Sequence, residues 1–329
     1  MQLQTIIPNL DSKLKIAHSD KVITIGSCFA ENIAEKFKYF KFDVLSNPFG
    51  VLYNPVSIYN SFKAIAEDKI FTEEDLVYNQ SEWHSFYHHS DFSFHEKDKM
   101  LENLNASLKS TKEFLRKSDL LIVTFGTAFV YRHVEKGIVV SNCHKLPREL
   151  FEHYMLGMYE AREFIQAAIE LAGEINPKLK ILLTVSPVRH WKDGAVENQK
   201  SKAILLLAVH EIVNEENSVF YFPSYEIMID ELRDYRFYDM DLVHPNKLAV
   251  EYIWEKFSEN YFTESTIEAM KKAEKISLAV KHRTRNPKSE RHKTFIESQI
   301  SYIKQLKEEY SYLNLDEELK HFESQLKNF

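Results

Sequence analysis

Two short segments far apart in the chain carry the residue types that acyl-transfer chemistry requires. The first, residues 26–28, reads Gly-Ser-Cys and places a hydroxyl beside a thiol. The second, residues 239–246, places Asp241 three positions before His244. A carboxylate that accepts a hydrogen bond from imidazole Nδ1 fixes the tautomer of the ring and leaves Nε2 free to act as a base. Together the segments predict a nucleophile that is activated by a histidine.

The Gly-Ser-Cys segment stands between a predicted strand, residues 21–25, and a predicted helix, residues 28–40. A β-branched run predicts the strand, and apolar residues at helical spacing predict the helix. Free backbone N–H groups at a helix N-terminus stabilise a thiolate or an oxyanion. Either Cys28 or Ser27 is therefore a candidate nucleophile. The alternative is that Ser27 only caps the helix and that Cys28 is a small buried apolar side chain.

Five short apolar runs, each followed by polar or turn-forming residues, predict the strands that position these segments. They are residues 21–25, 42–45, 119–125, 180–185 and 219–222. Helical patterns lie between them, at residues 57–67, 99–117, 150–172 and 201–216. This alternation is typical of an α/β fold with a doubly wound, mostly parallel sheet. Because ligands bind outside the carboxyl ends of such strands, the polar residues after them are expected to meet at one rim.

Candidates for that rim follow the third and fourth predicted strands. Gly126 and Thr127 follow the third strand, and Arg189 and His190 follow the fourth. A guanidinium beside an imidazole is suited to bind a carboxylate or a phosphate of a substrate. An ion pair between Arg189 and the nearby Asp193 is an equally open interpretation.

Composition limits the classes of protein to which this chain of 329 residues can belong. Its 42 basic and 49 acidic residues give a net charge of −7, which argues against a nucleic-acid-binding surface or a polybasic membrane surface. Two cysteines cannot form a disulfide scaffold and suit a reducing compartment. We expect a cytoplasmic protein because neither a membrane helix nor a signal peptide is recognisable. No glycine-rich phosphate-binding motif is present, and neither a cofactor nor a metal is predicted.

A long segment between the second and third predicted strands, about residues 68–118, is expected to be an insertion. It contains His84, His88 and His89 among serine and aromatic neighbours, which indicate a loop or a hairpin. Three roles are open to these histidines: a shared metal ion, a lining for the substrate site, or structural packing. The neighbouring residue types favour the last two.

Composition changes after about residue 262, which suggests a boundary between a body, residues 1–262, and a C-terminal extension, residues 263–329. The extension lacks glycine and is rich in lysine and glutamate. Apolar residues recur in it at helical spacing, at Ile296, Ile300, Ile303, Leu306 and Tyr310. We expect helices that dock on the body or on a partner, including a second copy of the chain as a homo-oligomer.

Several motifs of the body resemble those of one known family. GSCFA at residues 26–30 is the name-giving motif of the GSCFA-domain proteins, which look like a branch of the SGNH/GDSL hydrolase superfamily. The resemblance covers about residues 21–262. The other motifs that carry it are NPFG and YNP within 47–55, TFGTAFVY at 124–131, NCHK at 142–145, SPVRH and DG within 186–194, ELRDYRFY at 231–238 and HP at 244–245.

The superfamily resemblance implies a flavodoxin-like α/β/α sandwich with a nucleophile after the first strand and an Asp-x-x-His pair at the last helix. Asp241 and His244 match the acid and base positions of that pair. Gly50 matches the glycine whose N–H joins the oxyanion hole, and Asn47 lies in the same loop. A substrate site that includes these residues is what the resemblance implies.

Two positions depart from the pattern of the superfamily. The superfamily has Gly-x-Ser in its first block, the turn after the first strand, where this chain has Gly26-Ser27-Cys28. A match without a gap puts Cys28 at the nucleophile position, and a shift of one residue puts Ser27 there. The third block, residues 126–128, reads Gly-Thr-Ala in place of Gly-x-Asn, so its side-chain donor to the oxyanion is missing. Asn142 from the following loop is the preferred substitute, and Thr127 is the weaker one. Without a substitute, a rate lower by about 100-fold or more is expected.

The sequence therefore predicts a hydrolase of acyl esters, or an acyl transferase, that acts on a small-molecule or glycan ester. Cys28 or Ser27 attacks the carbonyl group, while His244 moves the proton and is oriented by Asp241. The alternative is a catalytically degenerate module that binds a ligand on the same scaffold. The missing asparagine and the unusual first block motivate this alternative.

Overall fold

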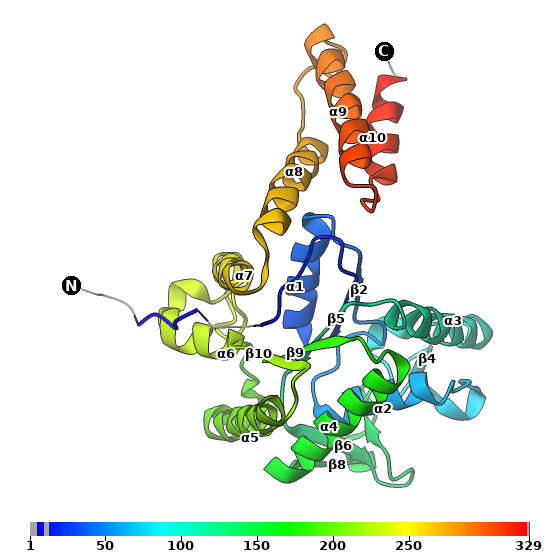
Figure 1. Cartoon of the computed structure of the whole chain (residues 1–329). Helices are drawn as coiled ribbons and strands as arrows, with labels where there is room; N and C mark the ends of the chain where they lie inside the picture. Colours follow the sequence, from blue (N-terminus) through cyan, green and yellow to red (C-terminus); the bar gives the residue numbers. More distant parts are fainter. Residues whose placement is uncertain (1–4, 10–12, 328) are drawn as a thin grey trace.

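A five-stranded parallel sheet forms the centre of the molecule (Figure 1). The computed structural model describes residues 5–9, 13–327 and 329. The strands lie in the order β10-β9-β5-β1-β2, and each pair of neighbours is parallel. Their bounds are Val22–Gly26 for β1, Val44–Ser46 for β2, Leu120–Phe125 for β5, Lys180–Val185 for β9 and Val219–Phe222 for β10. The five strands predicted from the sequence and the doubly wound α/β class are confirmed.

Helices cover both faces of this sheet (Figure 1). One face carries α1 (Cys28–Tyr39) and α7 (Lys247–Tyr261). The other face carries α2 (Pro55–Ala66), α4 (Met158–Ile175) and α5 (Gly194–Glu215). Successive strand residues point to opposite faces, so Val22 joins the core beneath α1 and Ile23 joins the core beneath α2. Burial on both faces explains the nearly continuous apolar runs of the strands.

Gly26 ends β1 at a point where the chain has no room for a side chain. Its φ of +142° is one that L residues rarely adopt, and an added Cβ would lie 2.1 Å from the carbonyl oxygen of Thr124 on β5. The N–H of Gly26 donates to Asn47 Oδ1 at 2.9 Å, and the N–H of Ser27 donates to Thr124 O at 3.0 Å. The turn that carries Cys28 is therefore held by backbone geometry.

A second, antiparallel sheet of three strands was not predicted. Its order is β7-β6-β8, with bounds Phe129–His133 for β6, Val139–Val140 for β7 and Phe151–Met155 for β8. The predicted helix 150–172 is wrong at its start, because residues 151–155 form a strand and α4 begins only at Met158. Every residue of β8 pairs with one of β6, so cross-strand pairing decides a segment whose apolar residues fit either period. The helix predicted at 201–216 begins earlier, at Gly194.

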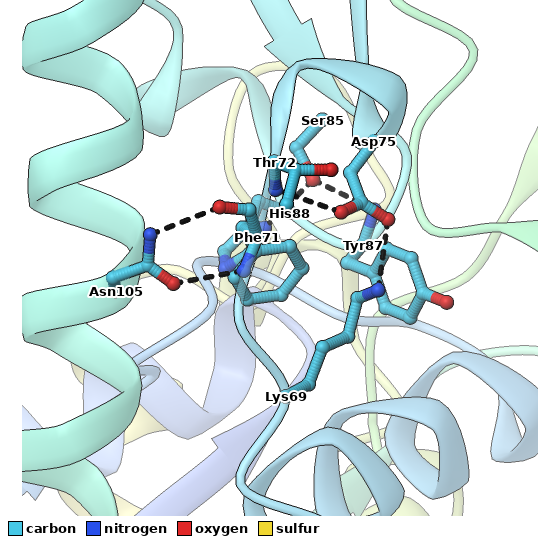
Figure 2. Close-up of polar contacts among 8 residues, drawn as sticks. All are labelled: Lys69, Phe71, Thr72, Asp75, Ser85, Tyr87, His88 and Asn105. Carbon is cyan, nitrogen blue, oxygen red and sulfur yellow. Dashed lines mark hydrogen bonds and ion pairs between the residues drawn. The ribbon is translucent and has the colours of Figure 1, made fainter.

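The insertion between β2 and β5 contains a hairpin, β3 (Leu76–Asn79) and β4 (Glu82–Ser85), followed by α3 (Lys97–Leu115). Figure 2 shows how the segment before the hairpin is fixed. Lys69 forms an ion pair of 2.8 Å with Asp75, whose carboxylate also accepts from the N–H of Thr72 at 2.9 Å. Asn105 of α3 binds both the N–H and the C=O of Phe71, at 2.8 and 3.0 Å. These contacts lie within the insertion and hold the segment before the hairpin against α3. Of the loop or hairpin expected around the three histidines, the structure has a hairpin strand at His84 and a loop at His88 and His89.

Three helices follow the body: α8 (Glu264–Lys281), α9 (Glu290–Glu309) and α10 (Asp316–Leu326). α8 leads away from α7, and α9 and α10 lie side by side at the far end of the molecule (Figure 1). The predicted helical character of the extension is confirmed. Among the residues that the structure describes, no helix combines the length and the apolar composition needed to cross a membrane.

The extension docks on the body through α8 and α10. Met270 of α8 packs into the core shared by α1 and α7, while Ile276 of the same helix packs with α9 and α10. An ion pair between Lys41 and Glu318 ties α10 to the end of α1. A domain boundary at residue 262, between α7 and α8, stays our proposal; α8 contributes to the cores on both sides of it.

Candidate active site

A cleft of about 550 Å³ opens beyond the carboxyl ends of β1, β5 and β9. Cys28 follows β1, Thr127 follows β5 and residues 188–193 follow β9, and all of them line the cleft. His244, from the loop before α7, lies on the same cleft. The structure thus brings the two chemically distinct segments of the sequence together at one rim of the sheet.

Asp241 and His244 form the hydrogen-bonded pair that their spacing suggests. His244 Nδ1 donates to Asp241 Oδ2 at 2.5 Å, and Asp241 Oδ1 accepts from the N–H groups of Val243 and His244, both at 3.0 Å. These backbone N–H groups, ahead of the imidazole, lower the pKa of the Asp241 carboxyl to about 2. The carboxylate is therefore ionised at neutral pH and fixes the ring, with Nε2 as its open nitrogen.

The structure separates the two candidate nucleophiles. Cys28 is half-buried and lines the cleft, whereas Ser27 is completely buried and does not. Ser27 Oγ has no hydrogen-bond partner among the described residues, and the side chain does not cap α1. Cys28 is thus the side chain that a molecule in the cleft meets, which favours the gap-free match over the shifted one.

The surroundings of Cys28 keep its thiol protonated. Burial is the largest influence and raises the pKa of the thiol, and the negative charge of Glu31 raises it further. The charge of Lys202 and the N–H groups of Cys28 and Phe29 act in the opposite direction but are outweighed. The N–H groups of the helix N-terminus therefore favour the thiolate, as expected, but burial outweighs them. Such a thiol reacts when a base removes its proton.

Cys28 and His244 line the same cleft without a hydrogen bond between them in the described part of the chain. The loop of His244 is held from two directions. Within the loop, the N–H of Asp239 donates to His244 O at 2.7 Å; from outside it, the N–H of Arg189 donates to Val243 O at 3.4 Å. Catalytic hydrogen bonds are often long in unliganded enzymes and shorten when the substrate binds. Both side chains are therefore accessible to a molecule bound in the cleft.

Gly50 and Asn47 support the turn before Cys28 instead of lining the cleft. The N–H of Gly50 donates to Asn47 O at 2.7 Å, and an added Cβ at this glycine, whose φ is +74°, would lie 2.4 Å from His89 Cβ. Asn47 Oδ1 in turn accepts from the N–H of Gly26 at 2.9 Å. The oxyanion role that the resemblance implies for Gly50 is not open to it in this conformation, because its N–H is already bound.

The backbone after β5 is engaged in the same way. The N–H groups of Gly126 and Thr127 both donate to Tyr53 O, at 2.7 and 3.0 Å. Thr127 Oγ1 shares a hydrogen bond of 3.0 Å with Ser201 Oγ. Thr127 lines the cleft and Gly126 does not. Neither N–H group is therefore available to bind an oxyanion.

Two asparagine amides remain as side-chain donors on the cleft. Asn142, the predicted substitute, accepts from the N–H of His144 through Oδ1 at 2.8 Å, and Asn54 caps α2 by accepting from the N–H of Ser57 at 2.9 Å. Both asparagines line the cleft, and their Nδ2 groups have no hydrogen-bond partner among the residues described. Asn54 was not predicted as a site residue. An asparagine before a proline at a helix start is the usual signal of a helix cap. The sequence therefore indicates the capping role of Asn54 and does not indicate that its amide also lines the cleft.

Arg189 and His190 both line the cleft but lie in different surroundings. His190 is largely buried, which lowers the pKa of its imidazole to about 4. Arg189 places its guanidinium over the Trp191 ring at 5.1 Å, and its Nε is buried without a partner among the described residues. The interpretation of Arg189 as the ion-pair partner of Asp193 is wrong for this structure. Asp193 Oδ1 lies instead 3.7 Å from Nε2 of His153, on β8.

Comparison with known families decides where the chain belongs. The model of the GSCFA family matches residues 21–257. The chain belongs to the GSCFA family. The model of the C-terminal domain of GSCFA domain proteins matches residues 273–328, which include α9 and α10. No curated protein matches this GSCFA protein.

Among solved structures, this GSCFA protein is similar to an acetyl xylan esterase, Est2A, from the rumen bacterium Butyrivibrio proteoclasticus. The two chains are 12% identical, and the match covers 74% of this chain and 64% of the esterase, with a TM-score of 0.37. A likeness of this extent leaves the chemistry of the GSCFA protein to be argued from its own residues.

The histidines of the insertion in the GSCFA protein serve packing and do not line the cleft. His84 Nδ1 lies 2.6 Å from Ser93 Oγ, and its ring stacks on His144 with centroids 4.6 Å apart. His88 bonds to Ser85 Oγ at 3.0 Å (Figure 2), and burial lowers the pKa of His88 to about 3. The interpretation of His84 as a substrate-lining residue is therefore wrong. The described residues contain no group of three or more His, Cys, Asp or Glu side chains placed to hold a metal ion.

Lys202 is a residue of the GSCFA site that the sequence did not reveal. It is 1% exposed, and its Nζ donates to Gly126 O and Ser186 O, both at 2.7 Å. It has no carboxylate partner in the described part of the chain. Burial lowers the pKa of Lys202 to about 7, while interaction with Cys28 acts to raise it. Its signal in the sequence is a lysine on the apolar face of a helix, three positions before the buried Leu205.

Tyr53 and Cys143 also line the cleft of the GSCFA protein without having been predicted. Burial, followed by the nearby Cys28, raises the pKa of Tyr53 to about 12, so its hydroxyl stays protonated. Burial raises the pKa of the Cys143 thiol to about 11. Cys143 is thus a second thiol in the same cleft and serves as an internal control for chemistry at Cys28.

Proposed function

We propose that this GSCFA protein is an acyl-ester hydrolase, or an acyl transferase, with Cys28 as nucleophile, His244 as base and Asp241 as the orienting carboxylate. The observation that carries the proposal is the shared cleft, which is lined by Cys28 and His244 from segments far apart in the chain. The 2.5 Å bond between Asp241 and His244 supports the assignment of roles. The proposal includes membership of the SGNH hydrolase superfamily, which the order of nucleophile and Asp-x-x-His pair along the chain supports.

The proposed reaction begins with a thiol, because the raised pKa of Cys28 leaves it protonated. His244 Nε2 takes this proton while the sulfur attacks the carbonyl carbon of the ester and the carbonyl oxygen becomes an oxyanion. When the tetrahedral intermediate collapses, the C–O bond breaks and His244 returns the proton to the leaving alcohol. A thioester on Cys28 remains. Water, or a second acceptor in acyl transfer, then attacks the thioester carbonyl while His244 takes its proton. The C–S bond breaks, the acid or the new ester leaves, and His244 returns the proton to the Cys28 sulfur.

The oxyanion is assigned to donors at the start of α1 and on the lining of the cleft. The N–H groups of Cys28 and Phe29 already favour negative charge on the Cys28 sulfur, so they are placed to favour it on the group that the sulfur attacks. Asn142 and Asn54 add side-chain amides from the lining of the same cleft. The charge of Lys202 beneath the cleft favours the same developing negative charge. Loss of one such donor typically costs about 100-fold or more in kcat.

A small-molecule or glycan ester is the proposed substrate class. Trp191 on the cleft is 50% exposed, and Tyr131 stacks on His153 with ring centroids 4.2 Å apart. Flat aromatic surfaces of this kind suit a sugar ring or an acyl chain. The free thiols of Cys28 and Cys143 support a location in a reducing compartment such as the cytoplasm.

Hydrolysis of p-nitrophenyl acetate by the wild type and by single variants tests the proposal. Cys28→Ala and His244→Ala are expected to lower kcat by about 100-fold or more. Ser27→Ala is expected to stay active and folded, because Ser27 Oγ makes no hydrogen bond that the change would remove. Cys143→Ala is the matched thiol control and is expected to stay active. Equal background rates in all five proteins would contradict the proposal, and loss in Ser27→Ala alone would name the serine as nucleophile.

A ligand-binding module without catalysis is the second candidate function. The engaged N–H groups of Gly50, Gly126 and Thr127 favour it, as does the raised pKa of Cys28. A module of this kind forms no acyl-enzyme, so none of the variants above changes the rate of ester hydrolysis. The same experiment therefore separates the two candidates.

A further inference from the structure

We infer that the cleft contains a subsite for an anionic group, a carboxylate or a phosphate, that is built on Arg189. The inference rests on the proposed function for one point, namely that the molecule bound in the cleft is the acyl-ester substrate. It follows that preferred substrates carry a negative charge at a distance from the ester carbonyl.

Arg189 presents a guanidinium that has no hydrogen-bond acceptor among the residues that the structure describes. Its Nε is buried and unbonded, and no carboxylate of the described residues lies within ion-pair distance of the side chain. Its contact is with the ring of Trp191, 5.1 Å from the guanidinium carbon. A buried donor that is left unbound costs free energy comparable to a lost hydrogen bond. A ligand that accepts from this fork removes the cost, and carboxylates and phosphates match its geometry.

The side chains that line the cleft include two cations, Arg189 and Lys192, and one carboxylate, Asp193. Lys202 lies buried beneath, bound to carbonyl oxygens, and Lys192 at the rim donates to the phenol oxygen of Tyr131 at 2.5 Å. Asp193 is the one carboxylate among the described residues that line the cleft, and it lies 3.7 Å from an imidazole. The whole chain carries a net charge of −7, so this local excess of positive charge does not follow from composition. It favours an anion from outside the chain.

The subsite is fixed relative to the proposed base. The N–H of Arg189 donates to Val243 O at 3.4 Å, which joins the loop after β9 to the loop of His244 at the edge of the cleft. The Trp191 ring covers one face of the guanidinium and leaves its N–H edge for a ligand. A substrate whose ester group binds at Cys28 and His244 therefore has the Arg189 side chain within the same cleft.

Calorimetric titration of small anions tests the subsite without any catalytic step. Glutarate and inorganic phosphate are titrated at low ionic strength into the full-length Cys28→Ala variant. At least one is expected to bind, glutarate if the subsite takes a carboxylate and phosphate if it takes a phosphate. Adding Arg189→Gln is expected to weaken binding by about tenfold or more. Arg132→Gln, which removes an exposed arginine paired with Glu152 outside the cleft, is the matched control and is expected to leave binding unchanged.

Binding of neither anion, or equal binding after Arg189→Gln, would overturn the inference. If the glutamine variant does not fold, Arg189→Lys replaces it, since lysine keeps the charge and the stem but loses the planar fork. Weaker binding by this variant supports the subsite, and affinity equal to that of the Cys28→Ala parent overturns it.

Ester selectivity gives a kinetic test of the same subsite. Arg189→Gln is expected to lower kcat/KM for mono-p-nitrophenyl glutarate about tenfold more than it lowers kcat/KM for p-nitrophenyl acetate. An equal loss on both esters would overturn the inference. If the wild type hydrolyses neither ester, the proposed function fails, while the calorimetry still decides the subsite.

Discussion

Asp241 holds His244 through both of its carboxylate oxygens. Oδ2 accepts from the imidazole Nδ1 at 2.5 Å, and Oδ1 accepts from the backbone N–H of His244 at 3.0 Å. One carboxylate therefore fixes both the ring and the peptide that carries it, on side chains that are about half exposed. The position of the proposed base is set by this local pair and by its loop, and does not depend on burial in the core.

Replacing Asp241 with asparagine keeps the shape of the side chain and removes its charge. We expect kcat for p-nitrophenyl acetate to fall by about 100-fold or more, because an amide neither fixes the correct tautomer nor stabilises the imidazolium. Asp239→Asn is the matched control, since Asp239 lies in the same loop but its Oδ1 accepts from the N–H of Met240. A loss of kcat of equal size in both variants would show that activity depends on the structure of the loop and not on the Asp241–His244 pair.

Lys202→Met tests whether the buried lysine sets the reactivity of Cys28. Loss of the positive charge is expected to raise the pKa of the thiol further, because an opposite charge nearby favours the thiolate. The rate of alkylation of Cys28 by iodoacetamide, followed against pH by peptide mass spectrometry, measures this change. Lys112→Met is the control, because Lys112 is also buried but pairs with Asp68 away from the cleft. An unmoved profile in Lys202→Met would assign the lysine a purely structural role.

His144 is expected to make the protein less stable in mild acid. Its side chain is 4% exposed, and burial lowers its pKa from 6.5 to about 4. The His144 imidazole therefore binds a proton more tightly in the unfolded chain than in the folded one. The contribution of neutral His144 to the free energy of unfolding is complete above pH 6.5 and is lost as the pH falls from about 6.5 to about 4. The loss is on the order of 3 kcal/mol of unfolding free energy.

Urea denaturation of the wild type and of His144→Gln at pH 7.5 and pH 4.5 measures this contribution. The variant is expected to show the smaller dependence on pH. His95→Gln, which changes a histidine whose side chain is 77% exposed, is expected to keep the dependence of the wild type. A pH dependence that is the same in all three proteins would mean that His144 does not carry it.

Gly26→Ala is expected to unfold the protein or to lower its free energy of unfolding by about 3 kcal/mol or more. The physical reason is the added Cβ, which would lie 2.1 Å from Thr124 O. Gly137→Ala separates this clash from backbone strain, because Gly137 also has a positive φ, +66°, but no atom lies within 4 Å of an added Cβ. We expect the control to cost about 1–2 kcal/mol. Thermal unfolding of both variants compares them, and equal losses would argue against the clash.

The central sheet could be predicted because its strands are short, apolar on both faces and followed by turn residues. The smaller antiparallel sheet could not. The segment at 151–155 has apolar residues that fit a helix as well as a strand, and only its pairing with β6 decides between them. The start of α5 at Gly194 was missed for a related reason, since residues 194–200, which read Gly-Ala-Val-Glu-Asn-Gln-Lys, carry little helical pattern.

The residues with chemically active groups could be found by type and spacing, and the structure places Cys28 and His244 on one cleft. The supporting groups could not be found in this way. The ammonium group of Lys202 is held by carbonyl oxygens from the loops after β5 and β9. These two loops lie far apart in the sequence, and only the folded sheet brings them together. The N–H of Gly50 is bound within its own turn, which no motif reveals. Burial of Cys28 outweighs its helix N-terminus, and burial follows from tertiary packing alone.

The most direct test of the proposed chemistry is detection of an acyl group on Cys28. The wild type is mixed with excess p-nitrophenyl acetate, quenched in acid at early times, digested and analysed by peptide mass spectrometry. We expect acetyl on Cys28 and none on Cys143 or Ser27, and formation at least about 100-fold slower in His244→Ala. Acetylation of Cys28 at an equal rate in wild type and His244→Ala, or no acetyl group on Cys28 at any time, would contradict the account.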